Sequence, residues 1–264
     1  MTQAELTNQN HKKTRVFSDW TPKGGIGKSS LAVQIAACLA EMGKKVLLIE
    51  IDMQRNASKT LLSESPEYNI THIITEKVPI TQAIYQAREN LFVIAADRDL
   101  DQAANHILIN GRKAYDVLKR AIDSLTGYNV VIFDHSPNWT TVTNAALRAS
   151  KEILVPVELE PYAIDGIIEM FEKLQDEMYD HELTITGIIP NKVDFRSPMT
   201  QTYLSQVTEE FKEKVTPYIR IDKQIPQSQA YKQTIFEFNS YSKSAKDIRK
   251  LVDFIINSGD NDNA

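Results

Sequence analysis

Residues 21–30 read TPKGGIGKSS, with three glycines, two lysines and two serines in ten positions. The stretch follows an apolar run at 15–20, typical of a strand, and precedes an amphipathic pattern at 28–42, typical of a helix. Glycines let backbone amides converge on an anion, and a helix N-terminus adds a favourable dipole. The stretch therefore predicts a phosphate-binding loop; the alternative is a glycine turn before a core helix.

The two lysines of this loop are predicted to have different tasks. Lys28 is expected to lie against the β- and γ-phosphates of a nucleotide, while the Ser29 hydroxyl binds Mg²⁺. Lys23, at the start of the loop, lies on the wrong side to reach the phosphates of its own nucleotide easily, but it could reach those held by a second subunit. The predicted nucleotide-binding residues of the loop are Gly24, Gly25, Ile26, Gly27, Lys28, Ser29 and Ser30.

Apolar runs and helical patterns alternate along the rest of the chain. The runs lie at 15–20, 45–50, 91–96, 129–134, 152–157, 183–190 and 216–221, and the helical patterns at 28–42, 80–88, 99–125, 139–149, 162–180, 198–214 and 241–257. This alternation predicts an α/β fold: a doubly wound, mostly parallel sheet with helices on both faces, of the P-loop NTPase kind. We expect one domain at 14–257, a disordered tail at 1–13 and a flexible acidic tail at 258–264.

Composition narrows the class of protein further. The chain has 264 residues, a net charge of −5 and a single cysteine, Cys38. One cysteine cannot form an intramolecular disulfide, which favours a reducing cytoplasm. No apolar stretch approaches the ~18 residues of a membrane span, so no membrane partner is expected. The negative charge argues against a globally basic nucleic-acid binder, but it does not exclude a local basic patch.

The loop departs from the strict pattern G-x-x-x-x-G-K-[ST], because Pro22 stands at the position of the first glycine. What is present, K-G-G-x-G-K-[ST], resembles the deviant Walker A ATPases of the ParA/MinD superfamily. The resemblance extends over about residues 14–257. It implies Mg·ATP as the bound nucleotide, a nucleotide-sandwich homodimer, and Lys23 as the lysine that acts across that dimer.

Three further segments carry the resemblance. LLIEIDMQRNAS (47–58) is similar to the family's second motif, which implies that Asp52 orients the attacking water and helps to organise Mg²⁺. VVIFDHSPNWTTVTNAAL (130–147) resembles the Walker B and switch segment, with Asp134 supporting Mg²⁺ through water. GIIPNKVD (187–194) implies that Asn191 contacts adenine, and Pro226 is a further predicted nucleotide contact. The predicted catalytic residues are thus Lys23, Lys28, Asp52 and Asp134, and the predicted metal site comprises Ser29, Asp52 and Asp134.

Some positions depart from the family pattern. Glu50 replaces the usual first aspartate of the second motif, Met53 and Arg55 replace proline and glycine, and Ser29-Ser30 replaces two threonines. The switch reads DHSP in place of the commoner D-x-P-P, so that His135 stands within it. These changes leave the hydrolysis rate and the behaviour of the switch open.

Within the superfamily, DNA partitioning is favoured. One cysteine cannot hold the cluster of a nitrogenase iron protein, and the acidic C-terminus does not match a MinD-like membrane helix. The resemblance implies an ATPase that binds nonspecific DNA as a dimer on the nucleoid, and a centromere-binding partner of the ParB or ribbon-helix-helix kind that stimulates hydrolysis. The predicted DNA-binding residues are Arg220, Lys223, Lys243, Lys246, Arg249 and Lys250. A solvated helix face is the alternative for this basic cluster, and a nucleotide-gated scaffold without DNA binding or a metabolic P-loop enzyme are the alternatives for the function.

Overall fold

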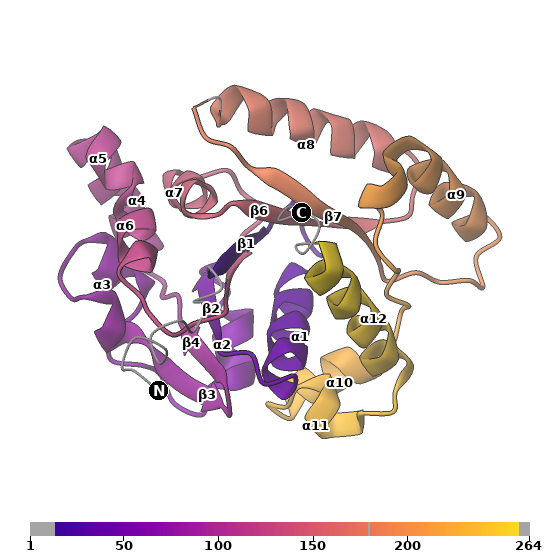
Figure 1. Cartoon of the computed structure of the whole chain (residues 1–264), viewed down its shortest axis with the longest axis horizontal. Helices are drawn as coiled ribbons and strands as arrows, with labels where there is room; N and C mark the ends of the chain where they lie inside the picture. The colour runs from indigo at the N-terminus through magenta and orange to yellow at the C-terminus, as the bar shows by residue number, and fades with distance from the viewer. Residues whose placement is uncertain (1–13, 179, 259–264) are drawn as a thin grey trace, which may run out of the picture.

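The fold is built on one seven-stranded sheet, described here from a computed structural model that covers residues 14–178 and 180–258 (Figure 1). The strand order is β3-β4-β2-β5-β1-β6-β7. Only the edge pair β3 and β4 is antiparallel. The predicted doubly wound, mostly parallel sheet is therefore confirmed. The strands are β1 (Arg15–Asp19), β2 (Val46–Ile51), β3 (Tyr85–Arg88), β4 (Leu91–Ile94), β5 (Val130–His135), β6 (Glu152–Glu158) and β7 (Thr184–Asn191).

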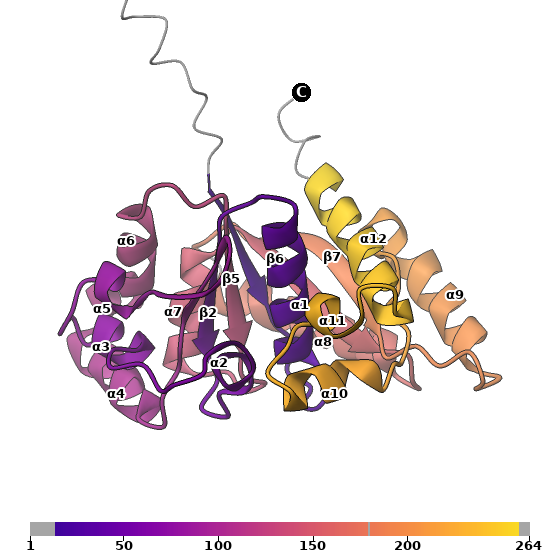
Figure 2. The same cartoon turned by 90° about the horizontal axis from the view of Figure 1, so that it is seen from below.

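Helices cover both faces of this sheet (Figure 1). One face packs against α1 (Lys28–Glu41), α2 (Asn56–Leu61), α10 (Gln224–Ala230), α11 (Ile235–Asn239) and α12 (Lys243–Ser258). The other packs against α3 (Ile70–Ile74), α4 (Leu100–Asn110), α5 (Arg112–Tyr115), α6 (Val117–Asp123), α7 (Thr141–Ala149), α8 (Ala163–Glu177) and α9 (Thr200–Phe211). Two short 3₁₀ turns, η1 (Ile80–Ala83) and η2 (Lys212–Lys214), complete the described elements. In Figure 2 the arrowheads of the central strands point toward the edge where α2 and α10 lie, which is where the loops of a parallel sheet gather ligand-binding groups.

Strand alternation turns three acidic side chains toward α1. Successive residues of a strand face opposite sides of the sheet. Phe17, Leu48 and Ile132 pack in the core cluster that contains α1. Two residues further along each strand stand Asp19, Glu50 and Asp134, which share that face. The strand register places Asp134 beside both of the others, because it pairs with Glu50 of β2 and with Asp19 of β1. The carboxyl ends of three neighbouring strands thus carry one row of acidic groups under the start of α1.

The prediction of a helix at 80–88 was wrong. The segment forms the short turn η1 and then β3, which pairs antiparallel with β4 through a tight connection at Glu89 and Asn90. Asn90 adopts a φ of 58°, the left-handed conformation that hairpin turns require and that asparagine accepts readily. Pairing with a neighbouring strand therefore overrides the helical composition of this segment.

Two other predicted elements are corrected. The single helix expected at 99–125 is three helices, α4, α5 and α6. Gly111, with a φ of 65° and a ψ of −152°, separates α4 from α5, and Asp116, with a φ of −91° and a ψ of 7°, separates α5 from α6. The strand expected at 216–221 is not continuous. It runs beside β7 through isolated bridges and through hydrogen bonds such as Ile219 N to the Pro190 carbonyl at 2.8 Å. Thr216 N donates to the Ile188 carbonyl and Ile219 N to the Pro190 carbonyl, so three residues of this segment span two residues of β7 and the register shifts there.

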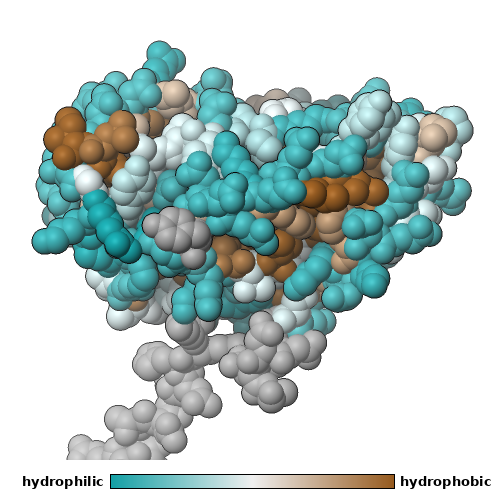
Figure 3. All heavy atoms as spheres, turned by 90° about the horizontal axis from the view of Figure 1, so that it is seen from above, coloured by the Kyte–Doolittle hydropathy of each residue, from teal (hydrophilic) through white to brown (hydrophobic). Residues whose placement is uncertain are grey.

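The predicted tails at 1–13 and 258–264 lie outside the described residues, apart from Ser258, which ends α12. No helix of the described chain is long and apolar enough to span a bilayer. Most of the face in Figure 3 is hydrophilic, with an apolar patch at the left, on the side where α4 and α5 lie in Figure 1. In α4, Leu108 is 60% exposed and Ile109 is 83% exposed.

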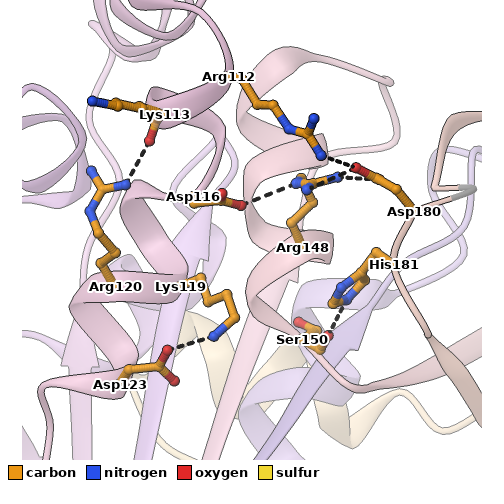
Figure 4. Close-up of polar contacts among 10 residues, drawn as sticks. All are labelled: Arg112, Lys113, Asp116, Lys119, Arg120, Asp123, Arg148, Ser150, Asp180 and His181. Atoms are coloured by element: carbon orange, nitrogen blue, oxygen red, sulfur yellow. Dashed lines mark hydrogen bonds and ion pairs between the residues drawn. The ribbon is translucent and has the colours of Figure 1, made fainter.

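A group of ion pairs ties together helices on the face opposite α1 (Figure 4). Arg148 of α7 contacts Asp116 at 3.2 Å and Asp180, in the turn before β7, at 2.7 Å. Arg112 of α5 contacts the same Asp180 at 3.1 Å. The hydrogen bond from Arg148 lowers the pKa of Asp180. Arg148 therefore holds α7 to two segments that are distant in sequence.

We expect Arg148→Ala to lower the thermal unfolding midpoint by about 2–4 °C, because Asp116 and Asp180 lose their shared cation. Nucleotide binding should be unchanged, since this group lies away from the phosphate loop. Differential scanning fluorimetry and a nucleotide titration check the two statements, and Arg196→Ala is the control because its pair with Asp194 is local and exposed. An unchanged unfolding midpoint in Arg148→Ala would show that the ion pairs of Arg148 do not stabilise the fold.

Candidate nucleotide-binding site

The glycine loop between β1 and α1 has the backbone conformation of a phosphate-binding loop. Gly25 and Gly27 adopt φ values of 78° and 92°, which side-chain-bearing residues rarely adopt. A Cβ atom on Gly27 would stand 3.0 Å from the side-chain nitrogen of Asn191. The Gly27 carbonyl accepts from Leu31 N at 2.9 Å and so begins α1. Glycine is required at position 27 both by its dihedral angles and by its neighbour.

Beside the loop lies a cavity of about 680 Å³, which is within the size range of small-molecule sites. Its walls come from the loop, from the segment after β2, from the end of β5 and from α10. The lining residues are Gly24, Gly25, Gly27, Lys28, Ser29, Ser30, Asp52, Gln54, Asn56, Lys59, Thr60, His135, Pro137, Pro226, Gln229 and Ala230. Most predicted loop residues, Asp52 and Pro226 are therefore brought together around one cavity.

Lys28 is the buried cation of this site. Only 6% of it is exposed, and its Nζ donates to the carbonyl oxygen of Lys23 at 2.8 Å, so that the side chain folds back over the loop. Burial lowers the pKa of Lys28, and the negative charges of Asp19, Asp134 and Asp52 oppose this shift. The ammonium group stands at the start of α1, where phosphate oxygens would be bound.

The residues predicted for Mg²⁺ lie on the same side of the loop. Ser29 and Asp52 line the cavity, and Asp52 Oδ1 accepts from Gln54 N at 2.9 Å. Asp134 is fully buried, and no hydrogen bond of good geometry reaches its carboxyl oxygens from the described residues. Burial raises the pKa of Asp134, and the neighbouring Glu50 and Asp19 raise it further, while the nearby Ser29 hydroxyl opposes the rise. A buried carboxyl group beside a serine hydroxyl fits a divalent cation with bound water, so these residues fit the predicted metal.

Glu50, a departure from the family pattern, has a structural task. Its Oε1 accepts from Ala57 N at 2.8 Å and Ser58 N at 3.2 Å, at the start of α2, and its Oε2 accepts from Ala96 N at 3.2 Å. Burial raises the pKa of Glu50, while these hydrogen bonds oppose that shift. Glu50 thus caps α2 and joins it to the segment after β4. Next to it, Arg55 adopts a φ of 58°, which explains why glycine suits that position in the family pattern.

His135 of the altered switch is held by a chain of hydroxyl groups. Ser150 Oγ donates to the Ala146 carbonyl at 2.9 Å, so Ser18 must donate to Ser150 across their 2.8 Å contact. The Ser18 oxygen then accepts from His135 Nε2 at 2.8 Å. Nδ1 is left as the unprotonated nitrogen and has no hydrogen-bond partner among the described residues. Burial and the charge of Lys28 lower the pKa of His135 to about 3, so the ring that lines the cavity is neutral.

This histidine should make the protein less stable in mild acid. The unfolded chain binds a proton at His135 below a pH of about 6.5, whereas the folded chain does not until the pH approaches 3, so stability falls with pH between those values. We expect the difference in unfolding free energy between the wild type and His135→Gln to decrease by about 2 kcal/mol from pH 7 to pH 5. Urea unfolding at both pH values measures it. A difference that does not change with pH would show that His135 is not held neutral.

Lys23 is not among the residues that line this cavity. Its ammonium group pairs with Glu160 and lies 4.0 Å from Glu158. Lys192 also pairs with Glu158, at 2.9 Å, and donates to the carbonyl oxygen of Gly25. Both lysines are partly exposed. The two lysines of the loop therefore face opposite sides, Lys28 inward and Lys23 outward.

Asn191, predicted to contact adenine, contacts the loop itself. Its side-chain nitrogen donates to the Ile26 carbonyl at 2.6 Å, and the residue is buried. The adenine contact remains a prediction. Trp20, which follows β1, is fully buried and makes an edge-on contact with Trp139 at 5.1 Å between ring centroids.

The structure separates the six predicted DNA-binding residues into two groups. Arg220 makes two hydrogen bonds with Asp247, at 2.7 and 2.8 Å, and Arg249 donates to the Ser240 carbonyl at 2.7 Å. The remaining residues, Lys223, Lys243, Lys246 and Lys250, are exposed. The apolar side of α12 is buried in the core, so the last three lysines share its outer side.

Among the residues of this site that reasoning from the sequence missed, two contact or pair with predicted site residues. Gln229 of α10 donates to Ser30 Oγ at 3.0 Å and so holds α10 against α1. Asp19, fully buried at the end of β1, is a neighbour of Asp134. The signal for Asp19 was the same as for Asp134, an acidic residue that ends an apolar run. No comparable signal in the sequence identifies Gln229.

Comparison with known proteins gives one consistent result. The AAA_31 family model, described as an AAA domain, matches residues 14–185. The sporulation initiation inhibitor protein Soj of Bacillus subtilis is 30% identical over 207 residues, covering 76% of this chain and 81% of that protein. The chromosome-partitioning ATPase Soj of Thermus thermophilus is 27% identical over 247 residues, covering 92% and 96%. The structure of the septum site-determining protein MinD of Pyrococcus horikoshii, complexed with Mg-ADP, superposes with a TM-score of 0.76 at 21% identity, covering 91% of this chain and 95% of that one.

Proposed function

The chain belongs to the ParA family of partition ATPases, within the ParA/MinD superfamily, and we propose that it is an ATP-driven DNA segregation switch. In this proposal it binds Mg·ATP, pairs face to face with a second copy and binds nonspecific DNA in that state. Hydrolysis then releases it from DNA. The cargo is a plasmid, and the site of action is the nucleoid in the cytoplasm.

The observation that carries the proposal is the arrangement of charges around the cavity. An inward lysine, Lys28, stands at the start of α1, and the buried carboxyl group of Asp134 and the hydroxyl of Ser29 lie close to each other in the same site. This arrangement suits a phosphate chain and the divalent cation that accompanies it. The name of the Thermus relative and the Mg-ADP in the Pyrococcus structure support ATP and Mg²⁺ as the ligands.

Each residue of the site has a proposed task in hydrolysis. Lys28 and the loop amides bind the β- and γ-phosphates, and Ser29 and Asp134 hold the metal, the latter through water. When bound, Mg²⁺ neutralises charge that develops on the phosphoryl oxygens. Asp52, at the wall of the cavity, orients the attacking water. Asn191 contacts adenine after it leaves the Ile26 carbonyl, and Pro226 packs beside the nucleotide.

Lys23 serves the nucleotide of the partner subunit. It lies on the outer side of the loop, and in the single chain Glu158 and Glu160 neutralise it. Both acidic groups are exposed enough that this pairing costs little to break. When two copies pair, Lys23 leaves these glutamates and binds the terminal phosphate of the nucleotide that the other copy holds.

DNA binding is assigned to the exposed lysines of α12, Lys243, Lys246 and Lys250, together with Lys223. Arg220 and Arg249 support this surface through Asp247 and Ser240. One copy offers few phosphate contacts, so affinity rises when a dimer doubles the surface. A centromere-binding protein of the ParB or ribbon-helix-helix kind stimulates hydrolysis.

We expect ATP-dependent binding to nonspecific duplex DNA, measured by fluorescence anisotropy, that weakens steeply with salt. Replacing Lys243, Lys246 and Lys250 by glutamine should weaken it and flatten the dependence of log K on log salt by roughly 0.9 for each phosphate group that the variant no longer neutralises. Lys23→Ala should remove the ATP dependence.

The matched control carries three glutamines, at Lys113 of α5, Lys119 of α6 and Lys77 shortly after α3. These helices lie on the other side of the molecule from α12 (Figure 1), and the net charge changes equally. Equal losses of affinity in the two triple variants would contradict the assignment to α12. Wild-type protein that does not bind DNA at low salt with ATP would contradict the proposed function.

A second function, a nucleotide-gated scaffold that positions cargo through protein contacts, is favoured by one observation. Leu108 and Ile109 of α4 are large, adjacent and exposed. Exposed apolar patches often mark protein interfaces. The same anisotropy experiment separates the two functions, because a scaffold of this kind has no DNA affinity with or without ATP.

A further inference from the structure

Arg88, the last residue of β3, has no task in the proposed function, yet its side chain joins segments that are distant in sequence. Nη1 donates to the Leu61 carbonyl at 3.1 Å and to the Ala87 carbonyl at 2.7 Å. Nη2 donates to the Lys232 carbonyl at 2.9 Å, and Nε pairs with Glu237 at 2.5 Å. A planar guanidinium group presents its donors in a fixed fork, so these bonds fix their acceptors relative to one another.

The Leu61 and Lys232 carbonyls belong to segments that form two walls of the nucleotide cavity. Leu61 ends α2 and directly follows Thr60, which lines the cavity. Lys232 lies two residues after Ala230, which ends α10 and also lines the cavity, and Lys232 N donates to the Gln229 carbonyl at 3.0 Å. In Figure 1 and Figure 2, α2 and α10 lie on either side of α1. One side chain outside the cavity is therefore bonded to both walls.

The other hydrogen bonds of these two walls hold each of them separately. Glu50 bonds to the start of α2, and Gln229 bonds α10 to α1. A second link between the walls runs from Lys232 Nζ to the Ser63 carbonyl, but it is longer, at 3.3 Å, and exposed. Of the hydrogen bonds that join the two walls among the described residues, those of Arg88 are the shorter ones.

We propose that Arg88 is a positioning residue for nucleotide binding, because its guanidinium group holds α2 and α10 at the separation that the nucleotide requires. The inference rests on the nucleotide site of the proposed function. Without Arg88 each wall keeps its own attachment, so the chain still folds, but the walls move relative to each other. The nucleotide must then order them when it binds, and this cost lowers its affinity.

ADP binding tests the proposal at a step that needs neither DNA nor a second copy. Arg88→Ala should raise the Kd of a fluorescent ADP analogue with Mg²⁺ about tenfold, while the amount bound per chain at saturation stays the same. A merely structural Arg88 would instead lower the urea midpoint of unfolding and the amount bound at saturation, with the Kd unchanged. An unchanged Kd in Arg88→Ala overturns the proposal.

Arg88→Lys separates the fork from the charge. It keeps a cation beside Glu237 but lacks the planar fork, so it should lose as much affinity as Arg88→Ala. Wild-type affinity in Arg88→Lys would show that the charge is sufficient and would overturn the assignment to the two carbonyl groups. The matched control is Arg120→Ala, because Arg120 also donates to a main-chain carbonyl, that of Lys113, and also pairs with a glutamate, Glu76, but contacts neither wall. It should bind ADP like the wild type, and a loss equal to that of Arg88→Ala would overturn the proposal.

Hydrogen exchange of the nucleotide-free protein gives a readout that does not require the proposed function. Arg88→Ala should increase the exchange rate of the amides of both α2 and α10 by about fivefold, because both helices lose the same bond donor. Faster exchange in only one of the two helices, or in neither, overturns the proposal whether or not ATP-dependent DNA binding is found. Wild-type protein that does not bind ADP would refute the nucleotide site and this proposal together, whereas wild-type binding with an unchanged Kd in Arg88→Ala refutes this proposal alone.

Discussion

Lys28→Ala should reduce the affinity for ATP and ADP at least about a hundredfold, since it removes charged hydrogen bonds to the phosphates in a site with little access to water. The side chain is 6% exposed and stands at the start of α1, so solvent does not replace it easily. No other lysine of the loop compensates, because Lys23 points to the opposite side. Isothermal titration calorimetry with ADP and Mg²⁺ measures the change.

The matched control is Lys23→Ala, a second lysine removed from the same loop. It should bind ADP like the wild type, because its ammonium group contacts Glu160 on the outer side of the loop. Circular dichroism of both variants checks that they fold. Equal losses of affinity in the two variants would contradict the division of tasks between the lysines, and wild-type affinity in Lys28→Ala would remove it from the phosphate site.

Asp52→Ala should reduce ATP hydrolysis at least about a hundredfold while ATP-dependent self-association is kept. Positioning or activating a nucleophilic water contributes about 10²–10⁴-fold in other enzymes. Asp52 is partly exposed at the cavity wall, and Oδ1 already accepts from Gln54 N, which fixes the orientation of the carboxyl group. Phosphate release measures hydrolysis, and light scattering with ATP measures self-association.

Asp52→Asn separates charge from local structure. Its amide oxygen can still accept from Gln54 N, so the segment after β2 keeps its shape while the negative charge is removed. Both variants should therefore hydrolyse ATP slowly. Rapid hydrolysis in Asp52→Ala would exclude Asp52 from the chemical step, and slow hydrolysis in Asp52→Ala but not in Asp52→Asn would assign Asp52 to loop structure alone.

The elements that were predicted well are those whose sequence pattern is a long run of neighbouring residues. The central strands β2, β5 and β6 are nearly continuous apolar runs, and α1 follows directly from the glycine loop. The errors occur where the structure of a segment depends on a neighbouring strand or on the backbone of a single residue. The segment 85–88 becomes a strand because β4 offers it an edge, and 216–221 has no regular ladder because its register against β7 shifts by one residue. Gly111 divides 99–125 because its backbone leaves the helical region.

The order of amino acids was enough to predict the phosphate loop, because its glycines, Lys28 and Ser29 all lie within ten consecutive residues. The position of Lys23 depends also on Glu158 and Glu160. The environment of that loop depends on how distant segments pack together. Asp19 and Asp134 become neighbours through strand register, and the protonation of His135 depends on Ser18, 117 positions away. Burial and hydrogen bonding between distant residues set the charges beneath Lys28, and no local pattern contains that information.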